Sequence, residues 1–393
     1  MSGSSPRKRA ALLAALALTI AAGAVVAARD GPGADAGAIP KLDLRDTLGR
    51  DAPFLRDFDI SALAQGAYPD QIRAIDEPLF DTPAEAGALL HPSDLVIGIE
   101  HGGEAHAYPL RLLSLHEVVN DVVGGLPVAV TWCPLCRTGL AYDRRVGGRV
   151  QLFGVSGLLY HRNLVLFDRE TRSLWSQLLG GAVTGPLRGT RLARVPVVQE
   201  TWGLWLGRHP GAPVLSIGRD AEAKAFTDPA FDESPAAGAE SSAEPYAGYG
   251  TKVNLHYGRT LRHLPDSTLV VGVDLNGAAK AYALAAVRTA GAVSDEVGGE
   301  PLLVAIGDEN TLSAAVYSRR LDGRTYDFEA RDGELVDTRT GSAWSPLTGR
   351  ALRGPLSGFE LARVPATASY WFAWRTTFPR TGLYAGELAK TGG

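Results

Sequence analysis

The amino-acid sequence predicts a strand-rich α+β protein built from two tandem, structurally similar repeats. Three observations lead to this class. Short segments of alternating apolar residues end at glycine pairs, as β-hairpins do. The chain of 393 residues has 46 glycines and 24 prolines, so turns are frequent and helices are short. Finally, the segment "LVIGIEHGGEAHAYPL", which starts at Leu95, recurs as "LVVGVDLNGAAKAYAL" from Leu269, and such recurrence indicates a duplicated unit.

The similarity continues further along the chain. The segment "WSQLLGGAVTGPLRGTRLARVP" starts at Trp175, and "WSPLTGRALRGPLSGFELARVP" starts at Trp344. Two more tryptophans recur at the same offset, Trp202 and Trp205 in the first copy and Trp371 and Trp374 in the second. Because Trp, Gly and Pro do not align by chance over such a length, the chain is interpreted as a tandem duplication.

These observations divide the chain into five parts. They are a signal peptide or N-terminal membrane anchor at 1–28, a flexible lead-in at 29–59, a first repeat at 60–229, an acidic Ser/Ala-rich linker at 230–250 and a second repeat at 251–393. The first part has a basic "PRKR" before an uncharged segment from Ala10 to Ala28, a pattern typical of export signals. The same segment is long enough to remain as a membrane-spanning helix. Both interpretations predict an exported protein, periplasmic or extracellular, in a compartment where cysteine pairs oxidise readily.

The elements of the first repeat follow from local patterns. Residues 94–108 are predicted to form a hairpin, and residues 108–123 a helix that ends at a glycine pair. A short buried strand, 126–132, leads directly to the cysteines. A second hairpin is predicted to turn at 146–148.

Comparison of the two copies separates scaffold from candidate site. Trp175 and Ser176 recur in the second copy and are interpreted as supporting residues. Side chains suited to acid–base, ligating or nucleophilic roles that only the first copy carries are candidates for chemistry. They are His116, Glu117, Asn120, Cys133, Cys136 and His161, with Ser156 and Asn163 as further supporting residues. Because the first copy concentrates them, we expect one working site beside a degenerate structural copy.

The predicted helix would bring several candidates to one face. His116, Glu117 and Asn120 follow Leu113 at i+3, i+4 and i+7. The strand after this helix delivers Cys133. If this strand packs back on the helix, His116 is expected to lie near Cys133.

The segment "TWCPLCRTG" holds both cysteines of the chain, and several hypotheses account for it. A thioredoxin-type pair needs a helix at the cysteines to lower the thiol pKa, whereas a strand pattern follows here, so only a different redox fold remains open. A structural disulfide would close a very small loop and stabilise the fold little. As a metal site, Cys133 and Cys136 would be completed by His116 and His161 around a soft metal, copper or zinc, although the spacing matches no usual zinc motif.

Four segments resemble the bacterial and archaeal family called domain of unknown function 3179: "YPLRLLSLHEVVND", "VAVTWCPLCRTGLAYDR", "FGVSGLLYHRNLVLFDRETRSLWSQLLGGAVTGPL" and "EPYAGY". The resemblance runs from about Ile60 to the C-terminus and implies an exported protein whose activity is unassigned. The second cysteine varies in that family, which implies that Cys133 is the more essential thiol and argues against an obligatory dithiol cycle. This chain departs from the family in "LLSLHE", where an aromatic residue more often precedes the histidine, and in "HRN".

The leading hypothesis is an exported protein with a thiolate-based metal-binding or redox site. One alternative is a cysteine-dependent enzyme, in which Cys133 is the nucleophile, His116 is its base and Glu117 or Asn120 orients the base. Another is a non-catalytic binding or scaffold module with a structural disulfide. The expected partner is a small molecule or a metal, and the N-terminal segment would supply any membrane attachment. The formal net charge of −4 gives no reason to expect nucleic acid.

Overall fold

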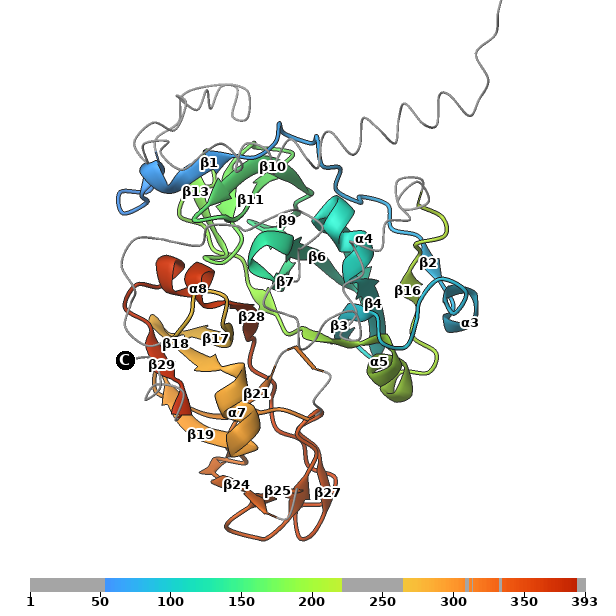
Figure 1. The fold of residues 1–393 in the computed structure, drawn as a ribbon, viewed down its shortest axis with the longest axis vertical. Coiled ribbons are helices and arrows are strands. Elements are labelled where there is room, and N and C mark those ends of the chain that lie inside the picture. Colours follow the sequence, from blue (N-terminus) through green and yellow to red (C-terminus); the bar gives the residue numbers. More distant parts are fainter. Residues whose placement is uncertain (1–53, 221–263, 308–310, 313, 332–333, 387–393) are drawn as a thin grey trace, which may run out of the picture.

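The computed structural model describes residues 54–220, 264–307, 311–312, 314–331 and 334–386. The predicted N-terminal segment, the linker and most of the lead-in lie outside these residues. Within them, β-strands dominate and the helices are short, which confirms the strand-rich α+β class (Figure 1). No helix in this part of the chain is long and apolar enough to span a bilayer.

Residues 54–220 build three sheets of four or five strands, which occupy the upper part of Figure 1. The first sheet has the spatial order β1 (Leu63–Gln65), β10 (Phe153–Tyr160), β11 (Asn163–Asp168), β12 (Leu174–Ser176) and β13 (Gly181–Thr184). The second has the order β14 (Arg194–Val195), β7 (Thr138–Asp143), β6 (Leu126–Cys133) and β5 (Val118–Val123). The third has the order β15 (Val198–Thr201), β3 (Leu95–His101), β4 (Glu104–Pro109), β16 (Val214–Leu215) and β2 (Phe80–Asp81). The predicted hairpin at 146–148 is confirmed as the small pair β8 (Arg145–Val146) and β9 (Arg149–Val150).

The described residues after 263 build three further sheets of three or four strands. One has the order β28 (Thr367–Tyr370), β17 (Leu269–Leu275), β18 (Ala278–Ala283) and β29 (Gly382–Tyr384). Another has the order β19 (Ala292–Val297), β20 (Glu300–Ala305) and β21 (Ala315–Ser318). The last has the order β24 (Phe328–Arg331), β25 (Glu334–Asp337), β26 (Ala343–Trp344) and β27 (Ala351–Arg353). The α-helices of the described chain are α3 (Pro83–Ala86), α4 (Leu110–His116), α5 (Trp202–Arg208), α7 (Leu284–Ala290) and α8 (Trp371–Thr377).

Elements follow one another in the same order in both halves. The run β3, β4, α4, β5, β6 in the first half corresponds to β17, β18, α7, β19, β20 in the second. The hairpin register corresponds as well, because Gly98 pairs with Ala107 and Gly272 pairs with Ala281. The two halves also share a hydrophobic cluster, in which both cysteines lie with tryptophans of α8.

The predicted helix at 108–123 is wrong in its second half. Helix α4 ends at His116, Glu117 takes the left-handed backbone conformation, and β5 begins at Val118. The valines of this segment are β-branched and favour a strand. The glycine pair 124–125 therefore turns the hairpin between β5 and β6 instead of ending a helix. The predicted common helix face of Leu113, His116, Glu117 and Asn120 does not exist.

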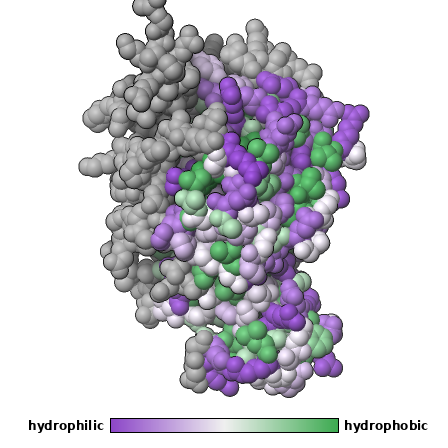
Figure 2. All heavy atoms as spheres, turned by 90° about the vertical axis from the view of Figure 1, so that its right-hand side faces the viewer, coloured by the Kyte–Doolittle hydropathy of each residue, from purple (hydrophilic) through white to green (hydrophobic). Residues whose placement is uncertain are grey.

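Hydrophobic residues on the described surface are dispersed. Figure 2 shows small hydrophobic patches among hydrophilic residues on the face that it presents. The exposed large hydrophobic side chains include Leu79, at 55% exposed, and Leu89, at 45%. Single exposed apolar residues of this kind are ordinary in folded proteins.

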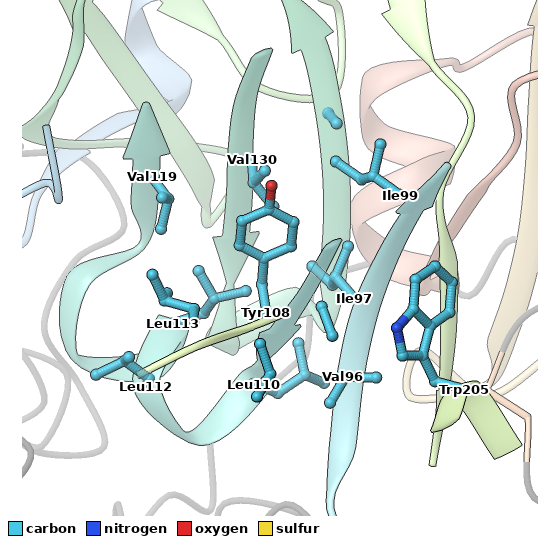
Figure 3. Packing of buried hydrophobic residues seen from close by; sticks show 14 of the residues in the cluster. Val96, Ile97, Ile99, Tyr108, Leu110, Leu112, Leu113, Val119, Val130 and Trp205 are labelled. Atoms are coloured by element: carbon cyan, nitrogen blue, oxygen red, sulfur yellow. The ribbon is translucent and has the colours of Figure 1, made fainter. Parts of the chain in front are cut away.

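A tryptophan packs on a strand glycine in each half. Figure 3 shows Trp205 beside the strand that carries Val96 and Ile97. A Cβ atom added at Gly98 would lie 2.1 Å from the Trp205 ring, and one added at Gly272 would lie 2.3 Å from the Trp374 ring. Glycine is therefore required at both positions, because the indole ring fills the space that a side chain would occupy.

Replacing either glycine by alanine should lower the free energy of unfolding by about 1–3 kcal/mol, because the indole must shift in a close-packed core. Urea unfolding of Gly98→Ala and Gly272→Ala measures this loss. Gly207→Ala is the matched control, since a Cβ at this helical position meets no atom within 4 Å. A loss no larger than that of the control would show that the ring adjusts freely.

Candidate functional site

Both cysteines lie in a tight connection between two buried strands. Strand β6 ends at Cys133, a 3₁₀ turn spans Pro134–Cys136, and β7 begins at Thr138. Cys133 is opposite Thr138 in the antiparallel pair. A strand follows the cysteines, as the sequence predicts, so no helix N-terminus acts on them. Both residues are free thiols; Cys133 is 2% exposed and Cys136 is fully buried.

The Cys136 sulfur accepts hydrogen bonds from two buried side chains. The Thr138 hydroxyl lies 3.1 Å from the sulfur and the Asn163 amide nitrogen lies 3.2 Å from it. Burial raises the pKa of the Cys136 thiol, but hydrogen bonds from Cys133, Thr138 and Asn163 outweigh burial and hold this pKa below its ordinary value. Hydrogen bonds donated to sulfur favour the thiolate. Cys136 is therefore the cysteine that this site prepares to carry a negative charge.

A second layer of polar contacts fixes the orientation of the Asn163 amide. The Asn163 oxygen accepts from the backbone N–H of Leu178 at 3.1 Å, so its nitrogen must face the sulfur and Gln177. Gln177 accepts from Asn163 at 2.7 Å and donates to the Thr131 hydroxyl at 2.9 Å and to the Thr138 carbonyl at 3.1 Å. All of these side chains are buried. The network thus directs donors toward the sulfur and leaves them little freedom to turn away.

The second half of the chain reaches this network through Ser369. Its hydroxyl lies 3.0 Å from the Thr138 hydroxyl and 3.1 Å from the Tyr370 carbonyl. The Thr138 hydroxyl donates toward Ser369, and Ser369 donates to the Tyr370 carbonyl, so the Ser369 oxygen and the Cys136 sulfur are both acceptors for the single Thr138 proton. The site is therefore built at the contact between the two halves.

Cys133 has the opposite character. Its sulfur lies 3.6 Å from the Arg162 carbonyl, a partner that can only accept. Burial, the Cys136 sulfur and the charge of Glu117 raise the pKa of the Cys133 thiol well above its ordinary value. The pair therefore consists of a protonated Cys133 and a Cys136 that favours the thiolate.

The structure does not form the predicted pair of His116 and Cys133. His116 directs Nδ1 to the Arg73 carbonyl at 2.6 Å and Nε2 to the Asp220 carboxylate at 3.1 Å. Because α4 ends at His116, the following residues turn into β5 and do not continue the helix face. Both ring nitrogens thus have partners other than the thiols.

Asn120 and His161 also bond outside the cysteine pair. The Asn120 amide donates to Asp76 at 2.7 Å and to the Phe153 carbonyl at 2.8 Å, and it accepts from the Phe153 N–H at 3.0 Å. The His161 ring packs on Tyr160 with 4.3 Å between centroids, and burial lowers the pKa of His161. Asn120 therefore joins strands, as a scaffold residue does.

The supporting residues hold the surrounding sheet. The Ser156 hydroxyl donates to the Val165 carbonyl at 2.5 Å, and the Trp175 indole donates to Asp168 at 3.0 Å. The Ser176 hydroxyl accepts from the Leu179 N–H at 3.5 Å. Asn163, predicted as a supporting residue, instead contacts the sulfur directly.

Four residues of the network were missed by the sequence analysis: Thr131, Thr138, Gln177 and Ser369. The sequence contains a signal for two of them, since Ala305 and Pro346 stand opposite Thr131 and Gln177 when the similar segments of the two halves are aligned. A comparison limited to acids, bases and cysteines overlooks such neutral donors.

The predicted metal set is not assembled around the sulfurs. Among the residues that the structure describes, no group of three or more His, Cys, Asp or Glu side chains is arranged to hold a metal ion. The arrangement brings together two sulfurs, the Asn163 amide, the Thr138 hydroxyl and Glu117.

Comparison with known proteins places the chain in one family. The family described as "Protein of unknown function (DUF3179)" matches residues 69–381, which include both halves and the cysteine site. No curated protein and no solved structure matches the chain. Because the match covers most of the sequence, the chain belongs to the DUF3179 family.

Proposed function

We propose that the first half of the chain carries a redox-active dithiol, in which Cys133 and Cys136 alternate between the reduced pair and a disulfide. The observation that carries this proposal is the pair of buried donors, Thr138 and Asn163, that face the Cys136 sulfur. A structural thiol in a core has no need of such donors, whereas a reacting thiol is activated by stabilising its thiolate.

The redox reaction is a thiol–disulfide exchange with an external disulfide. The Cys133 and Cys136 sulfurs together give up two electrons, and a sulfur–sulfur bond forms between them. The external disulfide takes up both electrons and leaves as two thiolates, which take protons from water, and the proton of Cys133 passes to a base. Because both sulfurs are buried, local opening of the surrounding segments must precede the exchange.

We infer further that the second half is a duplicated copy that has lost this site. The inference is supported by the common order of elements and by the recurring hairpin register. Gly307 stands at the place of Cys133. The second half would then serve to complete the first, in part through Ser369.

Export remains part of the proposal. It is supported by the basic and apolar N-terminal sequence, and an oxidising compartment would supply the external disulfide. Copper or zinc is the competing occupant of the two sulfurs, because soft thiolates bind both metals.

The proposal is tested by equilibrating the folded chain with glutathione buffers of graded potential and counting free thiols at each. We expect both thiols to disappear together and reversibly, while Cys133→Ser and Cys136→Ser form only a mixed disulfide. Thr138→Val, which keeps the side-chain shape, should raise the pKa of Cys136 by about one unit, because one hydrogen bond to sulfur is worth about 1 kcal/mol.

Two results would overturn the redox proposal. One is two thiols that stay free in fully oxidising buffer while the fold is intact. The other is one copper or zinc per purified chain, found by elemental analysis, that protects both thiols until a chelator removes it. Ser156→Ala is the matched control, because this buried hydroxyl bonds only backbone groups of its own sheet.

A further inference from the structure

Glu117 occupies a backbone position that favours glycine. It follows the last residue of α4 with a φ of 57°, in the left-handed region. Gly291 takes the corresponding place after α7 with a φ of 72°. A side chain in this region is strained where glycine is not, and such strain concentrates at functional positions. Because the backbone at this position favours glycine, the presence of a glutamate indicates that its side chain has a function.

The backbone around Glu117 holds this residue beside Cys133. The Trp132 N–H donates to the Glu117 carbonyl at 2.8 Å, which joins Glu117 to the end of the strand that delivers Cys133. The charge of Glu117 acts on the Cys133 thiol. Glu117 is still partly exposed, whereas Cys133 is 2% exposed. Glu117 is thus a half-buried residue beside the end of the strand that delivers the buried Cys133 thiol.

The environment of the carboxyl suits proton transfer near neutral pH. Burial raises the pKa of Glu117 to about 8, and no cation or hydrogen-bond donor of the described chain offsets this effect. A general base works best when its pKa lies near the operating pH. An ordinary exposed glutamate would be too weak a base for a thiol whose pKa is raised.

We propose that Glu117 accepts the proton of Cys133 when the dithiol is oxidised and returns it when the disulfide is reduced. This inference rests on the redox function proposed above. It gives a role to Glu117, the residue for which the second half has Gly291. It also explains why a side chain is kept at a position where the backbone favours glycine.

The proton step fits into the exchange as follows. The Cys136 thiolate first attacks the external disulfide, so that a mixed disulfide forms and one external thiolate leaves. The Glu117 carboxylate then takes the proton from the Cys133 sulfur. The Cys133 thiolate then attacks the Cys136 sulfur, the internal disulfide forms, and the external thiolate leaves with the electron pair of the broken bond. The protonated carboxyl finally releases its proton to water.

The test follows the mixed disulfide with glutathione by rapid acid quench and mass spectrometry between pH 6 and 10. In Glu117→Gln, closure to the internal disulfide should slow about 100-fold at pH 7, the lower range for loss of a general base. The wild-type closure rate should level off above pH 8, whereas that of the variant should keep rising with pH.

Glu117→Gly provides a second variant that the backbone accepts readily. Added acetate should restore part of its closure rate in proportion to the acetate concentration, because it replaces the missing carboxylate. Acetate should have no such effect on the wild type. A purely structural role for Glu117 would leave the pH profile unchanged and would not respond to acetate.

The outcomes separate this inference from the proposed function. If the wild type forms no internal disulfide with glutathione, the redox function itself is wrong. If the wild type cycles and Glu117→Gln closes at the same rate with the same pH profile, the redox function stands and the role of Glu117 is wrong.

Discussion

Glu117→Gly should raise the free energy of unfolding of the reduced protein by about 3 kcal/mol at pH 9 and by about 1 kcal/mol at pH 5. Relief of the left-handed strain contributes at both pH values, at roughly 1 kcal/mol. The larger effect at pH 9 comes from removing a carboxylate that burial makes costly to ionise. Substitution at the proposed site is thus expected to stabilise the fold.

The pH dependence follows from the direction of the pKa shift. The pKa of Glu117 is raised from 4.5 to about 8 in the folded protein. Between these values the folded state holds a proton that the unfolded state has released, so wild-type stability falls as pH rises toward 8. Each pKa unit corresponds to about 1.4 kcal/mol, and partial exposure of the side chain reduces the total to a few kcal/mol.

Urea unfolding of reduced protein at pH 5 and pH 9 measures both contributions. Glu117→Gln removes the charge but keeps the strained backbone, so the difference between the two variants isolates the strain. Equal stabilisation by Glu117→Gly at both pH values would show that the carboxyl is solvated, and no gain at pH 5 would show that the backbone is not strained.

Asp168→Ala and Asp337→Ala should each lower the free energy of unfolding by about 3 kcal/mol or more, because each leaves several donors without an acceptor. The Asp168 carboxylate accepts from the Thr171 N–H at 2.6 Å, the Ser173 N–H at 3.1 Å and the Trp175 indole at 3.0 Å. The same three kinds of bond recur at Asp337, at 2.6, 3.1 and 3.1 Å.

Acid should weaken the second of these loops. Burial raises the pKa of Asp337, but hydrogen bonds from Trp344, Thr340 and Ser342 outweigh it and hold the pKa below its ordinary value. This stabilisation is therefore complete above about pH 4 and is lost as pH falls through the lowered pKa.

Equilibrium unfolding at pH 7 compares the two variants. Asp143→Ala is the control, because its partner Arg145 is more than half exposed and such a pair contributes at most about 1 kcal/mol. If Asp168→Ala or Asp337→Ala lowers the free energy of unfolding no more than Asp143→Ala does, the buried carboxylate does not stabilise that loop.

Local patterns in the sequence were sufficient for the hairpins and for the strand that delivers Cys133. They failed between Glu117 and Val123, where the apolar spacing fits a helix and a strand equally well. The choice was made by the partner strand β6 and by the left-handed turn at Glu117, neither of which a single segment contains. Because the helix was predicted too long, the predicted contact between His116 and Cys133 was wrong as well.

The candidate site was predicted in composition better than in arrangement. The Asn163 amide bonds the Cys136 sulfur, while His116 bonds Arg73 and Asp220. Thr131 and Gln177 entered only with the structure, because a neutral hydroxyl or amide becomes informative once it is buried and aimed at a sulfur.

The sequence by itself determined the family, the strand-rich class and the close pair of cysteines, because these depend on local pattern and residue identity. Only the tertiary structure decided which thiol is stabilised as a thiolate. That outcome depends on donors brought from the start of β7 and from the start of β11. Hydrogen bonds to a buried sulfur act over about 3 Å, and residues so far apart in sequence reach that distance only when the chain has folded.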